Sequence, residues 1–381
     1  MIGFNLTEEQ KEMQAFFRKF SQERVKAAAE KMDEEEKMDM DLIHEMQSLG
    51  MFGIPFSEEV GGAGLDVFNY VLLMEELSKV DASTSITVSV HTSLCASSIE
   101  EFATPEQKEK WLRPLADGSK IGCFGLTEPD AGSDVAGART VAVKDGDEYV
   151  INGSKIFTTN SGFADTFLVF ALTDKAAGPH KGMSAFLIDR NTPGITVQPD
   201  IKRMGIRGAS NSEVVYTDVR VPASDLLGGE GKGFKIAMML LDGGRIGVAA
   251  QALGIAQGAI DECIPYLKNR KQFGKPLSAF QNTQFELADM QTKVDAARLL
   301  IYRAAMAKQN HEPYSHLAAM GKMFAADVAS DVTRRVVQLV GGCGYTREYP
   351  FERMMRDAKI TEIYEGTTEV QKMVVSGWML K

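Results

Sequence analysis

Hydrophobic and polar positions follow two different periods along the chain, and the changes between them divide it into three stretches. Residues 1 to about 120 carry apolar positions at helical spacing. Thr7–Gln10 and Thr104–Gln107 both fit a capping box that opens a helix, and Pro105 is well suited to a first helical position. Residues 83–96 are small or apolar, which indicates a fully buried helix. The first stretch is therefore predicted to be helical.

Near residue 121 the pattern changes to short β-rich runs separated by Gly, Asp, Asn and Pro. The runs occupy residues 149–153, 166–171, 184–188 and 213–221, and Pro222 follows the last of them. This spacing favours a compact antiparallel β domain over a series of βαβ units.

From about Gly229 the helical period returns and continues to the C-terminus. We expect long helices over residues 234–268, 280–308, 316–340 and 367–380. The predicted fold is α+β and has three parts. These are an N-terminal α-helical domain (1–120), a middle antiparallel β domain (121–228) and a C-terminal four-helix bundle (229–381).

Composition excludes several classes of partner. A net charge of -10 disfavours binding to nucleic acid or an anionic membrane, since both require a basic surface. The four cysteines are scattered without metal-ligand spacing, so we expect reduced thiols, no metal site and a cytoplasmic location. The charged N-terminus does not fit a signal peptide, and the apolar runs are too short to predict a membrane span.

Glycine-rich segments are present but miss the usual nucleotide-binding spacings. The sequence has neither GxGxxG after a strand nor GxxxxGK[ST], which disfavours a Rossmann enzyme and a P-loop NTPase. The segments 124–134 and 155–162 combine aromatic residues, hydroxyls and turns. They are suited to binding a flat polar ring, but an ordinary loop and a β-domain core are also possible.

Three further motifs each have a structural and a functional interpretation. Leu241–Arg245 places two glycines inside a helix, which indicates close helix packing or the close approach of a ligand. Arg270–Lys275 is a basic loop, either solvated or binding a pyrophosphate. Glu365 precedes a Gly-Thr-Thr helix start and is either a cap or a catalyst.

Six segments in order resemble the acyl-CoA dehydrogenase family over nearly the whole chain, from Phe4 to Gln371. They read FGLTEPDAGSD, KIFTTNSG, LDGGRIGVAAQALG, RKQFGKPL, QLVGGCGY and RDAKITEIYEGTTEVQ. The resemblance implies the three-part fold described above, FAD as cofactor and a homotetramer built as a dimer of dimers. It also implies that the adenine end of FAD reaches a neighbouring subunit.

The resemblance implies a role for individual residues. Glu365 matches the catalytic base that removes the α-proton of an acyl-CoA while the β-hydride passes to the flavin. Substrate binding is expected from Ser133, Asp242, Arg245, Tyr364 and Gly366. FAD binding is expected from Phe124, Leu126, Thr127, Gly132, Ser133, Phe157, Thr158, Thr159, Arg270, Phe273, Thr367 and Glu369, and, from the neighbouring subunit, Gln338, Leu339, Gly341 and Gly342. Glu369 departs from the Gln common in relatives.

The position of the base separates branches of the family. Some branches carry it in the helix that holds LDGGR, at a position that is Gly244 here, so Glu365 is the matching carboxylate. A helix N-terminus favours its anion, whereas burial raises its pKa. We expect burial to prevail only once substrate is bound.

The whole chain looks most like bacterial short-chain, or butyryl-CoA, dehydrogenases, with electron-transferring flavoprotein as acceptor. Branched, cyclic and dicarboxylic acyl-CoAs remain alternative substrates. An acyl-CoA oxidase is a second alternative, although many oxidases are longer. A non-catalytic relative that binds DNA or acts as a scaffold is a third, and the acidic net charge weighs against it.

Overall fold

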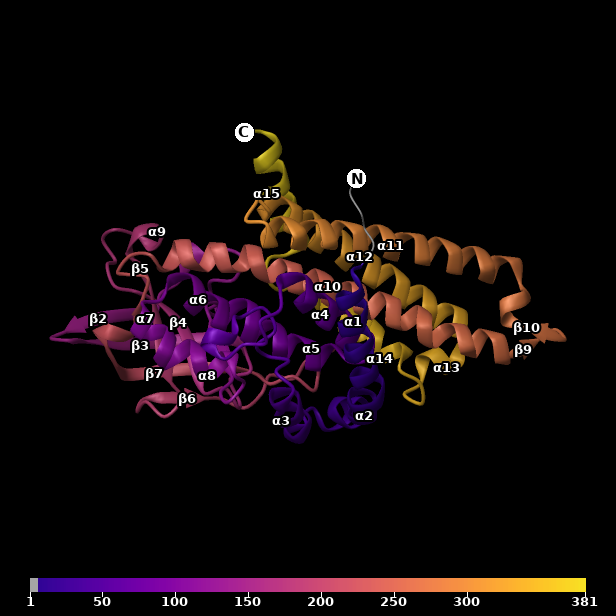
Figure 1. The fold of residues 1–381 in the computed structure, drawn as a ribbon, viewed down its shortest axis with the longest axis horizontal. Helices are drawn as coiled ribbons and strands as arrows, with labels where there is room; N and C mark the ends of the chain where they lie inside the picture. Colours follow the sequence, from indigo (N-terminus) through magenta and orange to yellow (C-terminus); the bar gives the residue numbers. More distant parts are fainter. Residues whose placement is uncertain (1–5) are drawn as a thin grey trace.

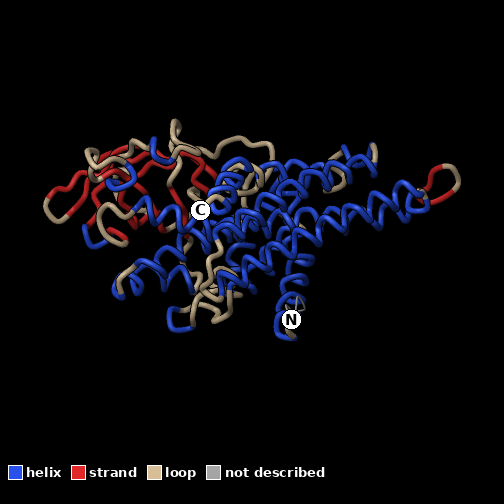
Figure 2. Tube along the Cα trace, turned by 90° about the horizontal axis from the view of Figure 1, so that it is seen from above, coloured by secondary structure: helices blue, strands red, loops and turns tan. Residues whose placement is uncertain are grey.

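The computed structural model describes residues 6–381 and forms an elongated molecule with a sheet at one end and long helices extending to the other (Figures 1 and 2). Phe4, where the family resemblance begins, lies outside the described residues. The N-terminal helices are α1 (Glu8–Phe20), α2 (Lys26–Glu35), α3 (Met40–Ser48), α4 (Val67–Ser78), α5 (Ala82–Ser89), α6 (Ser97–Phe102), α7 (Pro105–Gln107) and α8 (Arg113–Ala116).

Local sequence signals account for several helix starts in this part. The Thr7 hydroxyl accepts a hydrogen bond from the Gln10 N–H, and the Gln10 side chain accepts one from the Thr7 N–H. Thr104 and Gln107 repeat this capping box, which confirms both predicted boxes. The uncharged stretch after residue 82 is α5 followed by the π-helical segment η3 (Val90–Ala96), and both are buried throughout, as predicted.

The middle part is an eight-stranded sheet in the order β6-β7-β3-β2-β4-β5-β8, with β1 beside β4. Its strands are β1 (Gly122–Gly125), β2 (Val141–Asp145), β3 (Glu148–Thr159), β4 (Thr166–Leu172), β5 (Met183–Asp189), β6 (Ile195–Val197), β7 (Asn211–Pro222) and β8 (Leu226–Leu227), with the short helix α9 (Pro179–Gly182) before β5. The pairing is antiparallel except where β4 meets β1 and β2 in parallel. The expectation of a purely antiparallel domain therefore needs this correction, because β1 enters from the helical part and the β2–β3 hairpin intervenes before β4.

The C-terminal part is built around α10 (Gly233–Asn269), which runs along the long axis and packs against α12 (Figure 1). The other elements are the hairpin β9 (Lys271–Gln272) and β10 (Lys275–Pro276), then α11 (Gln281–Gln309), α12 (Ser315–Val340), α13 (Gly342–Tyr345), α14 (Phe351–Ile360) and α15 (Thr368–Met379). The four long predicted helices correspond to α10, α11, α12 and α15. Helix α14 was not predicted.

Helix α10 joins the N-terminal and C-terminal parts by close packing. A Cβ on Gly254 would overlap the Glu75 carbonyl oxygen, and a Cβ on Gly258 would overlap that of Lys79. The two glycines therefore let the backbone of α4 and its C-cap approach α10 directly. By length and composition α10 is apolar enough to cross a membrane, but most of its apolar stretch is buried inside the protein.

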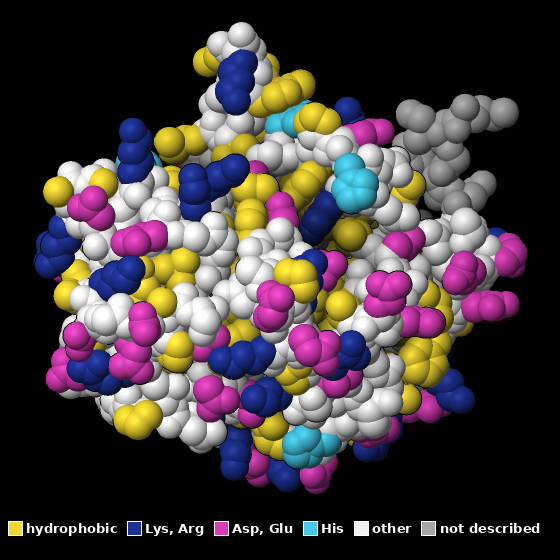
Figure 3. Space-filling model, turned by 60° about the vertical axis from the view of Figure 1, so that its left-hand side comes forward, with side chains coloured by type: hydrophobic (Ala, Val, Ile, Leu, Met, Phe, Trp, Pro, Cys, Tyr) yellow, Lys and Arg dark blue, Asp and Glu magenta, His cyan; other side chains and the backbone are white. Residues whose placement is uncertain are grey.

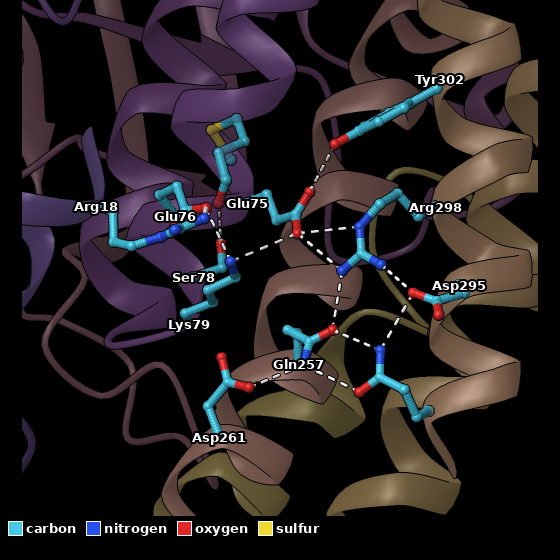
Figure 4. Close-up of polar contacts among 12 residues, drawn as sticks. Arg18, Glu75, Glu76, Ser78, Lys79, Gln257, Asp261, Asp295, Arg298 and Tyr302 are labelled. Atoms are coloured by element: carbon cyan, nitrogen blue, oxygen red, sulfur yellow. Dashed lines mark hydrogen bonds and ion pairs between the residues drawn. The ribbon is translucent and has the colours of Figure 1, made fainter. Parts of the chain in front are cut away.

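A polar network fills the space between α1, α4, α10 and α11 (Figure 4). Glu75 and Glu76 of α4 are both 1% exposed. The Arg298 Nη2 donates to Glu75 at 3.0 Å and to Gln257 at 2.9 Å, while Arg18 forms two hydrogen bonds with Glu76. Buried carboxylates persist when they are paired in this way, so the network ties the N-terminal helices to the bundle.

Candidate active site

Glu365 lies in the turn between α14 and α15. Helix α15 projects from the body of the molecule, at the top of Figures 1 and 3. Two residues of this turn have left-handed backbones, with φ +52° at Glu365 and φ +93° at Gly366. The N-cap of α15 is Thr367, whose hydroxyl accepts from the Val370 N–H at 3.4 Å. The cap interpretation of Glu365 is therefore wrong, because a neighbouring hydroxyl performs that function.

The Glu365 carboxyl points against α10 at Gly244. A Cβ at position 244 would overlap Glu365 Oε2 and would lie 3.0 Å from Leu94 Cδ2. Both carboxyl oxygens are buried, and neither has a hydrogen-bond partner among residues 6–381. A buried carboxyl without a partner is costly to maintain and marks a candidate for reaction rather than for structure.

Burial raises the pKa of Glu365 to about 7, and the positive charges of Lys322 and Arg245 oppose this effect. A carboxylate with a pKa near neutrality is well matched to general-base catalysis at physiological pH. The expectation that burial prevails only after substrate binds is wrong. Gly244 lies against the carboxyl in the protein chain itself, so desolvation is present from the start.

The glycine pair in α10 makes room for polar side-chain ends. Arg245 is 5% exposed and donates to Asp242, and its Nε has no partner in the described part of the chain. A Cβ on Gly243 would lie 2.8 Å from Lys308 Nζ. Gly243 and Gly244 thus face the functional groups of Lys308 and Glu365, which favours the functional interpretation of the pair over simple helix packing.

Tyr364 anchors the turn from its other side. Its hydroxyl is hydrogen-bonded to the side-chain oxygen of Gln251 on α10. Gln251 is 0% exposed and donates to the Ala82 carbonyl at 2.9 Å and to the Ser85 hydroxyl at 3.1 Å. The residue before Glu365 is therefore fixed to both α10 and α5.

The loop after β1 is held by a buried lysine that the sequence motifs did not single out. Lys155 is 0% exposed, and its ammonium donates to the Leu126 carbonyl at 3.1 Å and to Glu128 at 2.7 Å. The Thr127 carbonyl accepts from the Ile156 N–H at 2.9 Å. Phe124 packs on the sheet with its ring 5.2 Å from that of Phe170.

Phe157 turns out of β3 at an irregularity in the pairing with β7. Its backbone is left-handed, at φ +57°, and its side chain is 58% exposed. The buried hydroxyl of Thr158 has no partner among the described residues, and Thr159 accepts from the Asn211 side chain at 3.0 Å. An exposed aromatic beside an unpartnered hydroxyl fits the binding of a flat, polar ring system such as a flavin. Gly132 and Ser133 are exposed in the preceding loop.

Most of the other predicted cofactor residues do not lie beside Glu365 in the fold. Arg270 follows the last residue of α10, and Phe273, 93% exposed, forms the tip of the β9–β10 hairpin. This hairpin is at the end of the molecule opposite the sheet (Figures 1 and 2). The remaining residues, at the C-terminal end of α12 and just beyond it, are Gln338, Leu339, Gly341 and Gly342. Thr367 and the exposed Glu369 lie instead at the start of α15, next to Glu365.

Two polar side chains to which no site role was assigned hold the backbone of the Glu365 turn. Lys322 of α12 is 0% exposed and donates to the Gly366 carbonyl at 2.7 Å. Gln371, also 0% exposed, donates to the same carbonyl at 2.7 Å and to the Glu365 carbonyl at 3.2 Å. The available signal for Lys322 was a charged residue within a helix face of buried alanines.

Two small surface clefts lie elsewhere. One is lined by residues that include Glu36, Lys202 and Arg207, and the other by residues that include Trp111 and Asp225. Neither lining includes a residue predicted for the site.

Three family models together match most of the chain. The family descriptions acyl-CoA dehydrogenase N-terminal domain, middle domain and C-terminal domain match residues 7–119, 123–219 and 231–380. The short-chain specific acyl-CoA dehydrogenase of Clostridium acetobutylicum is 55% identical over 99% of both chains. The structure of butyryl-CoA dehydrogenase from Megasphaera elsdenii has a TM-score of 0.98 and 50% identity, over 100% of both chains. A structure described as the electron transferring flavoprotein of Acidaminococcus fermentans also has a TM-score of 0.98, with 51% identity and 100% of both chains covered.

The helix–sheet–helix architecture and these matches define the class: the chain belongs to the acyl-CoA dehydrogenase family. It is an oxidoreductase that uses FAD to dehydrogenate acyl-CoA thioesters.

Proposed function

We propose that this enzyme converts a short-chain acyl-CoA to its trans-2-enoyl-CoA, with Glu365 as the base that removes the α-proton. The observation that carries the assignment of the base is the buried Glu365 carboxyl, which has no hydrogen-bond partner among residues 6–381. Its pKa of about 7 makes it an effective acceptor at neutral pH. The names of the relatives from Clostridium acetobutylicum and Megasphaera elsdenii support short-chain specificity.

The α-proton of a thioester is weakly acidic, so removing it requires stabilisation of the developing enolate oxygen. We assign this role to the backbone N–H of Glu365, because the left-handed turn places base and backbone in one rigid unit. Arg245 contributes a fixed positive charge nearby and, with Asp242, is proposed to bind the CoA portion. Ser133, Tyr364 and Gly366 complete the proposed substrate contacts.

Proposed flavin contacts come from two sides of the site. The β domain contributes Phe124, Leu126, Thr127, Gly132, Ser133, Phe157, Thr158 and Thr159, and the start of α15 contributes Thr367 and Glu369. When bound, FAD accepts the hydride that leaves the β-carbon. The exposed face of Phe157 is suited to packing on its ring, and the buried hydroxyl of Thr158 is suited to one of its polar edge atoms.

The assembly and the electron acceptor are parts of the same proposal. Arg270, Phe273, Gln338, Leu339, Gly341 and Gly342 lie at the opposite end from the β domain, which supports a role in holding the adenosine end of FAD bound mainly by another subunit (Figure 1). We therefore propose a homotetramer. The free cysteines support the further proposal that it works in the cytoplasm. Similarity to the Acidaminococcus fermentans structure supports electron-transferring flavoprotein as the acceptor.

Glu365→Gln tests the assignment of the base, because it keeps the size of the side chain and removes its basicity. We expect the purified variant to stay yellow with FAD and to bind acyl-CoA, yet to lose bleaching of the flavin band by at least a hundredfold in rate. Anaerobic titration with acyl-CoAs of graded length measures this and the chain-length preference together.

The matched control is Glu312→Gln, the same change at an exposed carboxylate in the α11–α12 loop. It should bleach like the parent enzyme. Full bleaching of Glu365→Gln by substrate would show that the base lies elsewhere.

A further inference from the structure

Lys322 brings a positive charge into the protein interior beside the proposed base. Its side chain lies on α12 with 0% exposure, and its Nζ donates to the Gly366 carbonyl at 2.7 Å. This carbonyl belongs to the residue directly after Glu365. The ammonium therefore reaches the base through one peptide unit, without a direct hydrogen bond to the carboxyl.

Burial in the protein interior disfavours the charged form of the Lys322 side chain. Desolvation lowers the pKa of Lys322 to about 8, and the positive charge of Arg245 lowers it too. The negative charge of Glu365 is the largest opposing influence, followed by those of Glu362 and Asp327. The charge of Glu365 is thus the main influence that favours the protonated form of Lys322.

The backbone that Lys322 contacts has a conformation that its surroundings must stabilise. Glu365 at φ +52° is in a conformation that costs an L-residue roughly 1–2 kcal/mol, and such residues persist where the surroundings fix them. The Gly366 carbonyl accepts from both Lys322 and Gln371, and the Glu365 carbonyl accepts from Gln371. These three hydrogen bonds fix the turn that points the carboxyl at Gly244.

We propose that Lys322 is a positioning residue that fixes the left-handed Glu365–Gly366 turn and whose charge keeps the buried carboxyl of Glu365 available as an anion. The inference rests on the proposed role of Glu365 as base. Groups facing that carboxyl from other elements are Lys322 on α12, Arg245 on α10 and Tyr70 on α4, with Tyr364 beside it in the chain. Lys322 and Arg245 supply the positive charge near this carboxyl. The loss of Lys322 should therefore destabilise the anionic form of Glu365.

Three variants separate geometry from charge. Lys322→Met removes both the donor and the charge, Lys322→Gln retains a donor without the charge, and Gln371→Met removes a donor while leaving Lys322 charged. Lys31→Met on the exposed face of α2 is the control. Thermal unfolding of each holoenzyme reports whether it folds, and Lys322→Met should lower the melting temperature, because it removes the hydrogen bond to the Gly366 carbonyl, while unfolding stays cooperative.

The first readout is the pH dependence of flavin reduction by substrate in a single turnover. The base must be deprotonated, so the rate rises with pH through the pKa of Glu365. Loss of the positive charge raises that pKa, which should move the acidic limb to higher pH in both Lys322 variants. At pH 7 we expect the rate of Lys322→Met to fall tenfold to a hundredfold. Gln371→Met should lose rate with an unmoved limb.

The second readout does not depend on turnover. Infrared difference spectra between the enzyme and its Glu365→Gln variant follow the carboxyl stretch as pH is changed, in each Lys322 background. An upward shift of the titration in the Lys322 variants is the expected result. If Glu365→Gln is inactive while both Lys322 variants keep the parental acidic limb and titration, the inference about Lys322 is overturned and the base assignment stands. An active Glu365→Gln would instead remove the proposed function.

Discussion

Gly244 and Glu365 are distant in the sequence, but the Glu365 carboxyl fills the space that a side chain at position 244 would need. The carboxyl oxygen of Glu365 lies where a side chain at 244 would begin, and Leu94 covers the same point at 3.0 Å from the position of that Cβ. A catalytic carboxylate at 244 and one at 365 therefore exclude each other sterically in this backbone. Glycine at 244 is therefore required if the proposed base, Glu365, enters from the turn before α15.

Gly244→Ala tests this relation with a single methyl group. Alanine favours a helix over glycine by up to about 1 kcal/mol, so the variant should fold. The methyl displaces the carboxyl, and a displacement of about 1 Å lowers the rate of proton removal by roughly a hundredfold. Single-turnover flavin reduction measures the rate, and Gly377→Ala is the control, since its Cβ would meet nothing within 4 Å in the described structure. Parental rates in Gly244→Ala would contradict the steric account.

How far residues could be predicted depended on whether their partners are local. Thr7 and Thr104 cap helices through residues three positions away, and the sequence predicted both. For Glu365, residue type and position left a cap and a catalyst open, and the family resemblance favoured the catalyst. Lys322 was missed because its partner is a backbone carbonyl 44 residues away, and no local motif encodes such a contact.

Helices were predicted from the sequence more accurately than the pairing of strands was. The apolar period predicted residues 234–268 as a helix, and α10 spans Gly233–Asn269. The parallel pairing of β1 with β4 joins residues 44 positions apart at Gly122 and Thr166, so it depends on tertiary contacts rather than on a pattern within either strand. The ten-residue α14 was missed because its short amphipathic stretch follows Pro350 inside a motif-rich segment.

The close backbone contacts at Gly254 and Gly258 predict which substitutions α10 tolerates. Gly254→Ala would place a methyl on the Glu75 carbonyl oxygen of α4, and backbone atoms cannot move aside cheaply. We expect a net loss of about 1–3 kcal/mol in stability, seen as a lower melting temperature. Gly321→Ala is the matched helix-interior control, because its Cβ would lie 3.6 Å from Ile301 in ordinary contact. That variant should gain up to about 1 kcal/mol. Equal melting temperatures for the two would refute the packing argument.

At the scale of the molecule, the proposed site residues fall into two groups, one from the β domain and the turn before α15, the other toward the end of the molecule opposite the sheet (Figures 1 and 2). Arg270 and Phe273 lie at and near the β9–β10 hairpin, with Phe273 93% exposed and its backbone left-handed at φ +49°. An aromatic side chain displayed on a two-stranded hairpin is suited to contact with another molecule. We therefore propose that each chain contributes two half-sites and that complete sites form only between subunits.

Complementation between two inactive variants tests whether the half-sites meet between subunits. Glu365→Gln loses the base but keeps the hairpin end, whereas Arg270→Ala keeps the base and loses the proposed pyrophosphate contact. Each alone should be inactive or poorly loaded with FAD. Suppose that each site combines the base of one subunit with the hairpin end of the other. Equal co-expression then makes half of the dimers mixed. Each mixed dimer has one intact composite site. Activity should therefore recover to about a quarter of the parental value. If both half-sites acted within one chain, each subunit would carry its own defect and mixing would restore nothing, so the absence of recovery in isolated mixed oligomers would contradict the shared site.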